Sequence, residues 1–182
     1  MSVTLELARQ VGASDRSLRR AVVLGLVRGR RATANKLMLA PGEAEYVRDH
    51  WSLLQGLRSA LRTEPSVQTA VLYGSTARGD DAPDSDIDLA VVIKIGADLH
   101  PYDLARRLAR RLERDVQVID LERALRDPCF AFNIIEDGRP VVDRAGLWPR
   151  LRRRRAALTR AAAVQRVERE NEMTRAFREL LT

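Results

Sequence analysis

The chain has 182 residues, of which 45% are apolar and 31% charged, and its formal net charge is +7. This length suits one domain of ordinary size or two small ones, with enough apolar side chains for real cores. No stretch approaches the ~20 apolar residues that cross a bilayer. A single cysteine, Cys129, excludes a disulfide framework within the chain and a thiolate metal site. Because the N-terminus lacks a signal-peptide pattern, we expect a cytoplasmic protein with no membrane contact.

Charge is distributed unevenly along the chain. Residues 1–64 carry a net charge of +5, residues 65–145 a net charge of −4, and residues 146–182 a net charge of +6. The basic ends favour contact with a polyanion, and the acidic middle favours cation binding. Solvated arginines that need no ligand are the alternative for both ends. We expect three units with these boundaries.

The first unit, residues 1–64, reads as two short helices, a hairpin and a long helix. Apolar residues recur at helical spacing over 4–11 and 15–24, and Ser14 is placed to cap the second helix. Residues 26–40 predict two short strands around a polar turn, and residues 43–62 return to helical spacing. Exposed arginines are expected on the second helix and on the hairpin, namely Arg16, Arg19, Arg20, Arg28, Arg30 and Arg31.

This order of elements resembles the winged-helix regulators. In that family the second helix enters the major groove of DNA and the wing contacts the backbone. The resemblance therefore implies DNA binding through the six arginines. No clear helix precedes residue 4, so the usual three-helix core is one helix short. A small helical cap packed on the following domain is the alternative.

The second unit, residues 65–145, alternates strands with helices. Strands are predicted over 67–74, 86–93 and 115–121, a basic amphipathic helix over 101–113, and a helix end, a turn at Gly138 and an apolar stretch over 130–143. Such alternation indicates an α/β or α+β fold. From Pro149 to Thr182 the chain reads as one long basic helix, which could pair with a second copy in a homodimer, bind a partner or follow phosphates.

A short loop and two aspartates carry the chemistry of this unit. Gly74 follows a buried strand and lets the backbone approach an anion, while the Ser75 hydroxyl can donate to phosphate oxygens. The Walker pattern GxxxxGK[ST] is absent. Asp86 and Asp88 lie two apart on the next strand, so both carboxylates share one face, ~7 Å apart along it. Carboxylates so placed repel each other unless a cation lies between them, and hard oxygen ligands suit Mg²⁺.

The sequence Gly74-Ser75, then ten residues, then Asp86-Ile87-Asp88 resembles the signature of the polymerase-β-like nucleotidyltransferase superfamily. The fuller stretch YGSTARGDDAPDSDIDLAVV is similar to its minimal branch, which includes kanamycin-type nucleotidyltransferases and the nucleotidyltransferase antitoxins paired with HEPN toxins. The resemblance covers about residues 67–143. It implies an α+β fold with a small mixed sheet and flanking helices.

The resemblance also implies roles for individual residues. Gly74 and Ser75 would contact a nucleoside triphosphate, ATP above all, and Arg78 would neutralise phosphate charge. Asp86 and Asp88 would bind two Mg²⁺ ions and act as the catalytic carboxylates of an in-line phosphoryl transfer. The neighbouring acids Asp80, Asp81 and Asp84 are interpreted as solvating the loop.

The sequence departs from the family at a third carboxylate, which a neighbouring strand usually supplies. Gln117 occupies that position, and glutamine cannot serve as a general base. Asp115 and Asp120 are possible substitutes, although neither is in register. Two hypotheses follow. The first is an Mg²⁺-dependent nucleotidyltransferase that acts on a macromolecular hydroxyl, with an antitoxin that has a toxin partner as one form of this hypothesis. The second is a winged-helix regulator whose nucleotidyltransferase domain binds nucleotide or a partner protein without turnover.

Overall fold

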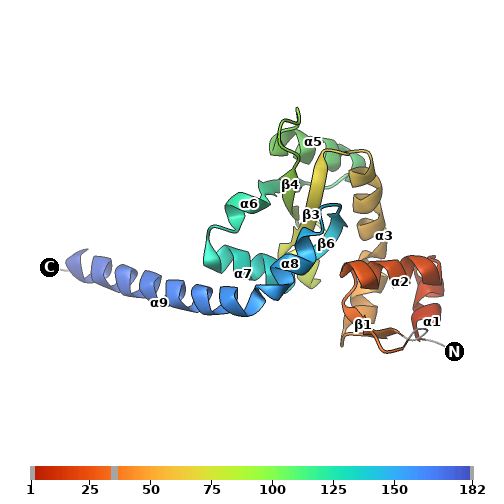
Figure 1. Ribbon diagram of the computed structural model, residues 1–182, viewed down its shortest axis with the longest axis horizontal. Coiled ribbons are helices and arrows are strands. Elements are labelled where there is room, and N and C mark those ends of the chain that lie inside the picture. Colours follow the sequence, from red (N-terminus) through yellow and green to blue (C-terminus); the bar gives the residue numbers. More distant parts are fainter. Residues whose placement is uncertain (1–2, 34–36, 181–182) are drawn as a thin grey trace.

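The computed structural model describes residues 3–33 and 37–180 and shows an α+β fold. Its N-terminal part consists of α1 (Val3–Gln10), α2 (Asp15–Leu24), a hairpin of β1 (Gly29–Arg31) and β2 (Leu37–Leu39), and α3 (Glu43–Arg62) (Figure 1). The predicted helices and strands of this part are confirmed. Ser14 caps α2 as expected, because its hydroxyl accepts a hydrogen bond from the Ser17 N–H. The predicted turn at residues 34–36 lies outside the described residues.

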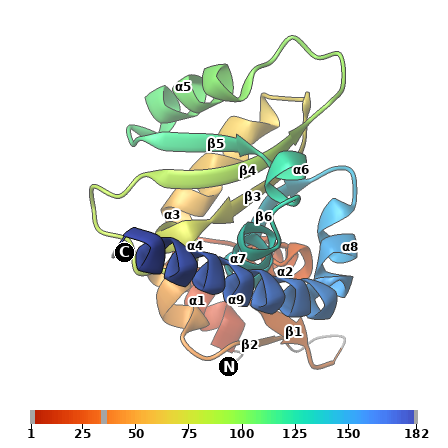
Figure 2. The same ribbon diagram turned by 90° about the vertical axis from the view of Figure 1, so that its left-hand side faces the viewer.

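A mixed four-stranded sheet follows, in the order β5-β4-β3-β6. Its strands are β3 (Val67–Tyr73), β4 (Ile87–Ile93), β5 (Val116–Asp120) and β6 (Arg139–Asp143). β3 runs antiparallel to both β4 and β6, whereas β4 and β5 are parallel and are connected through α5 (Pro101–Leu112) (Figure 2). A parallel pair needs such a crossover, since a hairpin turn reverses the chain. β5 therefore lies at one edge of the sheet.

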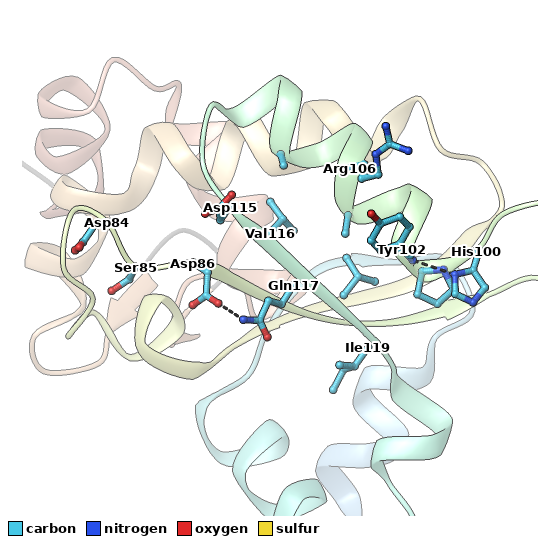
Figure 3. A pocket seen from close by; sticks show the side chains of 14 residues that line it. Asp84, Ser85, Asp86, His100, Tyr102, Arg106, Asp115, Val116, Gln117 and Ile119 are labelled. Atoms are coloured by element: carbon cyan, nitrogen blue, oxygen red, sulfur yellow. Dashed lines mark hydrogen bonds between the residues drawn. The ribbon is translucent and has the colours of Figure 1, made fainter.

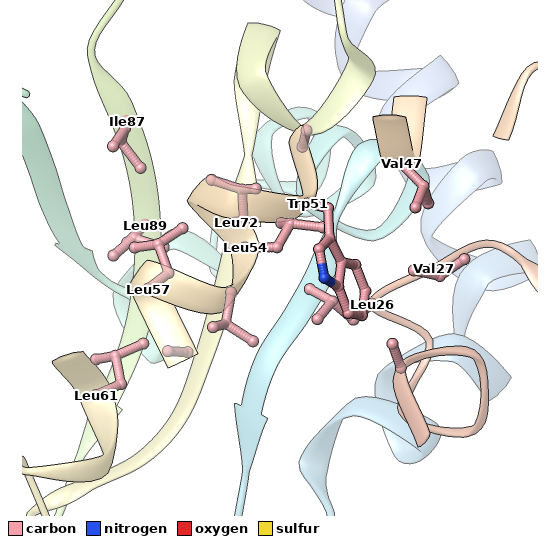
Figure 4. Packing of buried hydrophobic residues seen from close by; sticks show 14 of the residues in the cluster. Leu26, Val27, Val47, Trp51, Leu54, Leu57, Leu61, Leu72, Ile87 and Leu89 are labelled. Carbon is pink, nitrogen blue, oxygen red and sulfur yellow. The ribbon is translucent and has the colours of Figure 1, made fainter. Parts of the chain in front are cut away.

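Helices cover both faces of the sheet and enclose two hydrophobic clusters. On one face, α3 packs on inward side chains of β3 and β4 such as Leu72, Ile87 and Leu89 (Figure 4). Leu104 and Leu108 of α5 belong to the same cluster. The same cluster reaches into the N-terminal part, where it includes Leu18 of α2. On the other face, Val71 and Ala90 pack against the helices that follow β5. The alternation of buried residues along β4 thus matches the two-residue period of a strand covered on both sides.

Four helices after β5 build the second face. They are α6 (Leu121–Ala124), α7 (Pro128–Asp137), α8 (Leu147–Arg153) and α9 (Arg155–Leu180). The prediction of one helix from residue 149 to 182 is wrong in one respect, because the helix is interrupted at Arg154, between α8 and α9. α9 packs on α7 near its start and then extends away from the body (Figure 1). Within the described residues, no helix combines the length and apolarity needed to span a bilayer.

Candidate nucleotide and metal site

The stretch after β3 is a short helix, not the loop expected from its glycines. α4 (Gly74–Arg78) begins directly at the strand end and closes at Gly79. Gly74 has φ +74°, and a Cβ there would overlap the carboxylate of Asp88. Both the left-handed backbone and the close approach require glycine at this position. The backbone of Gly74 therefore lies against one of the two predicted catalytic carboxylates.

Asp86 and Asp88 share one face of the β4 segment, as the two-residue spacing predicts. Ile87 and Leu89 point to the opposite side and are fully buried in the first hydrophobic cluster. Asp88 pairs across the ladder with Tyr73, the last residue of β3. The Thr76 hydroxyl donates to the Asp86 carbonyl oxygen at 3.3 Å and thereby ties α4 to the acidic segment.

Gln117 lies directly beside the two carboxylates. It pairs with Asp88 in the parallel ladder, and its side-chain amide donates a hydrogen bond to Asp86 Oδ2 (Figure 3). Asp120, one of the two possible substitutes for the third acid, instead caps α6 by accepting from the Arg123 N–H at 2.8 Å. Asp115 is exposed at the start of β5. The side chain that contacts the acidic pair from the neighbouring strand is therefore an amide.

The interpretation of Asp81 as a solvated loop residue is wrong. Its side chain is only 8% exposed, lies within hydrogen-bonding distance of His50 Nε2 of α3, at 2.7 Å, and forms an ion pair with Arg114, at 3.3 Å. Arg114 also donates to the Ser85 carbonyl oxygen at 2.5 Å. Burial pushes the pKa of Asp81 upward, but the hydrogen bonds and charges of these partners outweigh it and hold the pKa below its usual range. This cluster fastens the segment that leads into Asp86.

The acidic pair is electrostatically strained in the absence of a cation. Burial raises the pKa of Asp88, and the nearby charge of Asp86 raises it further, while Arg78 opposes both. Burial also raises the pKa of Tyr73 to about 12, again with contributions from Asp88 and Asp86. A raised carboxyl pKa means that the charged form is held at a cost, which an added positive charge would relieve.

These residues fit a divalent cation shared with a polyphosphate. In the part of the chain that the structure describes, no three or more His, Cys, Asp or Glu side chains gather to hold a metal ion. Mg²⁺, however, is commonly bound by one or two carboxylates, with phosphate oxygens and water completing its octahedron. Asp86 and Asp88 supply those carboxylates, and the exposed guanidinium of Arg78 lies close enough to lower the pKa of Asp88. Arg78 is engaged on its other side by Asp80 and Asp137.

The arginines expected to bind nucleic acid differ in their surroundings. Arg19 forms an ion pair with Asp15 one turn earlier, and the half-buried Arg28 donates to the Asp137 carbonyl oxygen at 2.7 Å. The exposed members of the set are Arg16, Arg20, Arg30 and Arg31.

Half of the chain, including this site, matches a family of known proteins. The model of the family described as polymerase beta, nucleotidyltransferase matches residues 55–146, just over half of the chain. The chain belongs to this nucleotidyltransferase family. The matched residues include Gly74-Ser75 and Asp86-Ile87-Asp88, at the site described above.

One curated relative and two solved structures are similar to this nucleotidyltransferase. The protein adenylyltransferase MntA of Shewanella oneidensis is 38% identical over 61 residues, which is 33% of this chain and 44% of that protein. The match thus spans less than half of the relative's length. A toxin–antitoxin crystal structure with AMP-PNP and one of a mutant MntA-HpeT toxin–antitoxin each have a TM-score of 0.51. They are 22% and 20% identical, and each alignment covers 68% of this chain and 98% of the other, so they support the fold.

Proposed function

We propose that this chain transfers a nucleoside monophosphate, AMP first among the candidates, from a nucleoside triphosphate to a hydroxyl of a partner protein. The observation that carries the proposal is the placement of Asp88 against the backbone of Gly74, at the start of α4, with Asp86 on the same face of the β4 segment. The name of the MntA relative, protein adenylyltransferase, favours ATP and a protein acceptor. The toxin–antitoxin neighbours, one of them with AMP-PNP, favour a toxin as that partner.

The chemistry would be an in-line displacement at the α-phosphorus. An oxygen–phosphorus bond forms from the acceptor hydroxyl, the bond between the α-phosphorus and the bridging oxygen breaks, and pyrophosphate leaves. Asp86 and Asp88 would hold Mg²⁺, which when bound neutralises phosphate charge and acidifies the acceptor hydroxyl. Gly74 and Ser75 would position the phosphates, and Arg78 would offset their charge. Gln117 is no base, and Asp120 of β5 is engaged in capping α6, so the hydroxyl proton would pass to water.

The proposal is tested by incubating the purified chain with α-labelled ATP, Mg²⁺ and the product of the adjacent gene. We expect label on that protein, lost in the double variant Asp86→Asn/Asp88→Asn and retained in Asp98→Asn, an acid in an exposed loop. In calorimetry with Mg²⁺, ATP binding should likewise be lost in the double variant and retained in Asp98→Asn. Equal ATP affinity in wild type and double variant would refute the assignment of the two aspartates. Binding without label transfer would favour a regulator that does not turn over.

A second candidate function, DNA binding, is favoured by the N-terminal surface. Arg16 and Arg20 are exposed on the capped helix α2, and all three residues of β1 are exposed, including Arg30 and Arg31. Each phosphate neutralised contributes about −0.9 to the slope of log K against log salt. Binding of the full chain to the DNA upstream of its own gene can be measured by fluorescence anisotropy at several salt concentrations. In Arg30→Ala the slope of log K against log salt should become less steep by about one unit. Equal affinity for random duplex at all salt concentrations would contradict a regulatory role.

A further inference from the structure

The outer edge of β5 presents unpaired backbone groups next to the acidic pair. β5 has β4 as its neighbour on one side and no strand on the other among the described residues. The Ile87 N–H donates to the Asp115 carbonyl oxygen at 2.8 Å, which fixes the phase of the parallel ladder. Because backbone groups alternate in direction along a strand, Val116 and Val118 turn their N–H and C=O groups away from β4.

A groove runs along this edge between β5 and α5. It has a volume of about 940 Å³ and is continuous from Asp86 and Gln117 at one end to His100 and Tyr102 at the other (Figure 3). On the helix side its floor is formed by Ala105 and Ala109, one turn apart, whose small side chains leave the strand edge open. A second cavity of about 840 Å³ begins at Val118 and Ile119 and continues past α6.

We propose that this groove binds an extended segment of the acceptor protein, which adds to the sheet as a further strand beside β5. The inference rests on the proposed function and names how its substrate is held. An extended polypeptide is the ligand that satisfies outward N–H and C=O groups at a two-residue period, as in strand addition to a sheet edge. A nucleotide or a sugar cannot satisfy that pattern.

The geometry of strand addition also brings an acceptor hydroxyl to the site. An added strand lies about 4.8 Å from β5, and its side chains alternate between the two faces of the sheet. On one face they meet Val116, Val118 and the small residues of α5. On the other face they lie beside Gln117, which contacts Asp86. A long hydroxylated side chain, such as tyrosine, then extends across Gln117 toward the two carboxylates. The amide at position 117 contributes no further negative charge on this path.

The deciding measurement is NMR-detected amide hydrogen exchange of the wild-type chain, with and without the product of the adjacent gene. We expect the amides of Val116 and Val118 to exchange at least 10-fold more slowly when that protein is present, because each then donates to the added strand. The amides of Gln117 and Ile119 already donate within the sheet, so their exchange serves as the internal control.

A pair of variants tests the same contact in the transfer reaction. Val118→Pro removes an outward N–H that the ladder to β4 does not use, a substitution that edge strands tolerate. Val118→Ala removes the side chain and keeps the N–H. We expect Val118→Pro to lower label transfer at least 10-fold while leaving ATP affinity unchanged, and Val118→Ala to retain transfer.

The outcomes separate the groove from the transferase reaction. Transfer of label with no change in exchange at Val116 and Val118 would overturn strand addition and leave the proposed function standing. Slowed exchange without any label would keep the groove as a binding site and refute transfer. Neither label nor slowed exchange would overturn both. If Val118→Pro fails to fold, the exchange measurement on the wild-type chain still decides.

Discussion

At the scale of single residues, Gln117 sets the charge of the candidate site. Its amide donates to Asp86, so a carboxylate in its place would exchange a hydrogen bond for repulsion. We expect Gln117→Glu to have a lower melting temperature than the wild-type chain when no metal is added. On addition of Mg²⁺, its melting temperature should rise by more than that of the wild-type chain. Where the new carboxylate reaches the acceptor, the transfer rate should rise, with an upper bound of ~10²–10⁴-fold. Thermal melts with and without Mg²⁺ measure this effect, and Gln117→Asn serves as the uncharged control. A Mg²⁺ response equal to that of the wild type would contradict it.

The raised pKa of Asp88 predicts a pH-dependent stability effect at the same site. Because its pKa in the folded chain lies above the unfolded value, ionising Asp88 costs folding free energy at neutral pH. Asp88→Asn removes that cost, so without metal it should raise the melting temperature at pH 7. The gain should fade as pH drops through the raised pKa and vanish below the ordinary value of 3.8, where Asp88 is protonated in both states. Melting curves from pH 3 to 8, beside Asp98→Asn, measure it. A pH-independent gain would point to packing instead of charge.

At the scale of secondary structure elements, α4 depends on the backbone of its first residue. Gly74→Ala would place a Cβ against the Asp88 carboxylate in a left-handed conformation. Gly12 offers a matched control, since it has φ +64° and open space around its Cα. Left-handed strain alone costs about 1–2 kcal/mol. We expect Gly12→Ala to lose about that much stability in urea melts, and Gly74→Ala to lose more because the Asp88 carboxylate must also shift. Only Gly74→Ala should lose ATP binding. Retained binding in Gly74→Ala would separate α4 from the nucleotide site.

Sequence periodicity identified most elements but not how distant ones meet. The strands β3 and β4 and the longer helices were predictable because apolar residues recur every two residues in a strand and every three to four in a helix, over seven residues or more. α4 has five residues, too few for a period to emerge. Asp81 was misread because its neighbours in sequence are acidic and polar, whereas its partners His50 and Arg114 lie 31 and 33 residues away. The contact between Gln117 and Asp86 likewise depends on strand register, which single-strand patterns do not fix.

At the scale of the whole molecule, a buried ion pair joins the N-terminal part to the nucleotidyltransferase sheet. Arg139 of β6 is 1% exposed and donates to Glu43 of α3, to the Leu26 carbonyl oxygen and to the Ala77 carbonyl oxygen of α4. Its guanidinium lies 3.4 Å from the ring centroid of Tyr46. One side chain thus contacts the segment after α2, the long helix α3 and the end of α4.

Removing one partner of this pair should destabilise the whole fold. We expect Arg139→Met to cost about 3–5 kcal/mol, because Glu43 would be left buried and unpaired, and Arg139→Met/Glu43→Met to recover much of it. The exposed pair Arg107–Glu64 is the control, and Arg107→Met should cost no more than about 1 kcal/mol. Urea unfolding measures all three variants. A double variant no more stable than Arg139→Met would show that the backbone contacts of Arg139, and not the unpaired charge, hold the parts together.

The C-terminal part of the long helix α9 extends away from the rest of the molecule (Figure 1). Among the described residues, the ion pair farthest along α9 that reaches the body joins Arg169 to Asp127. The eleven residues from Glu170 to Leu180 continue for about 16 Å beyond it. At the first residue of α9, a second ion pair joins Arg155 to Glu136. Both pairs are exposed, so dissolved ions screen them readily. Because the Cys129 N–H of α7 also donates to Gln165 of α9, we expect added salt to weaken the two ion pairs while this contact keeps the first half of α9 on α7.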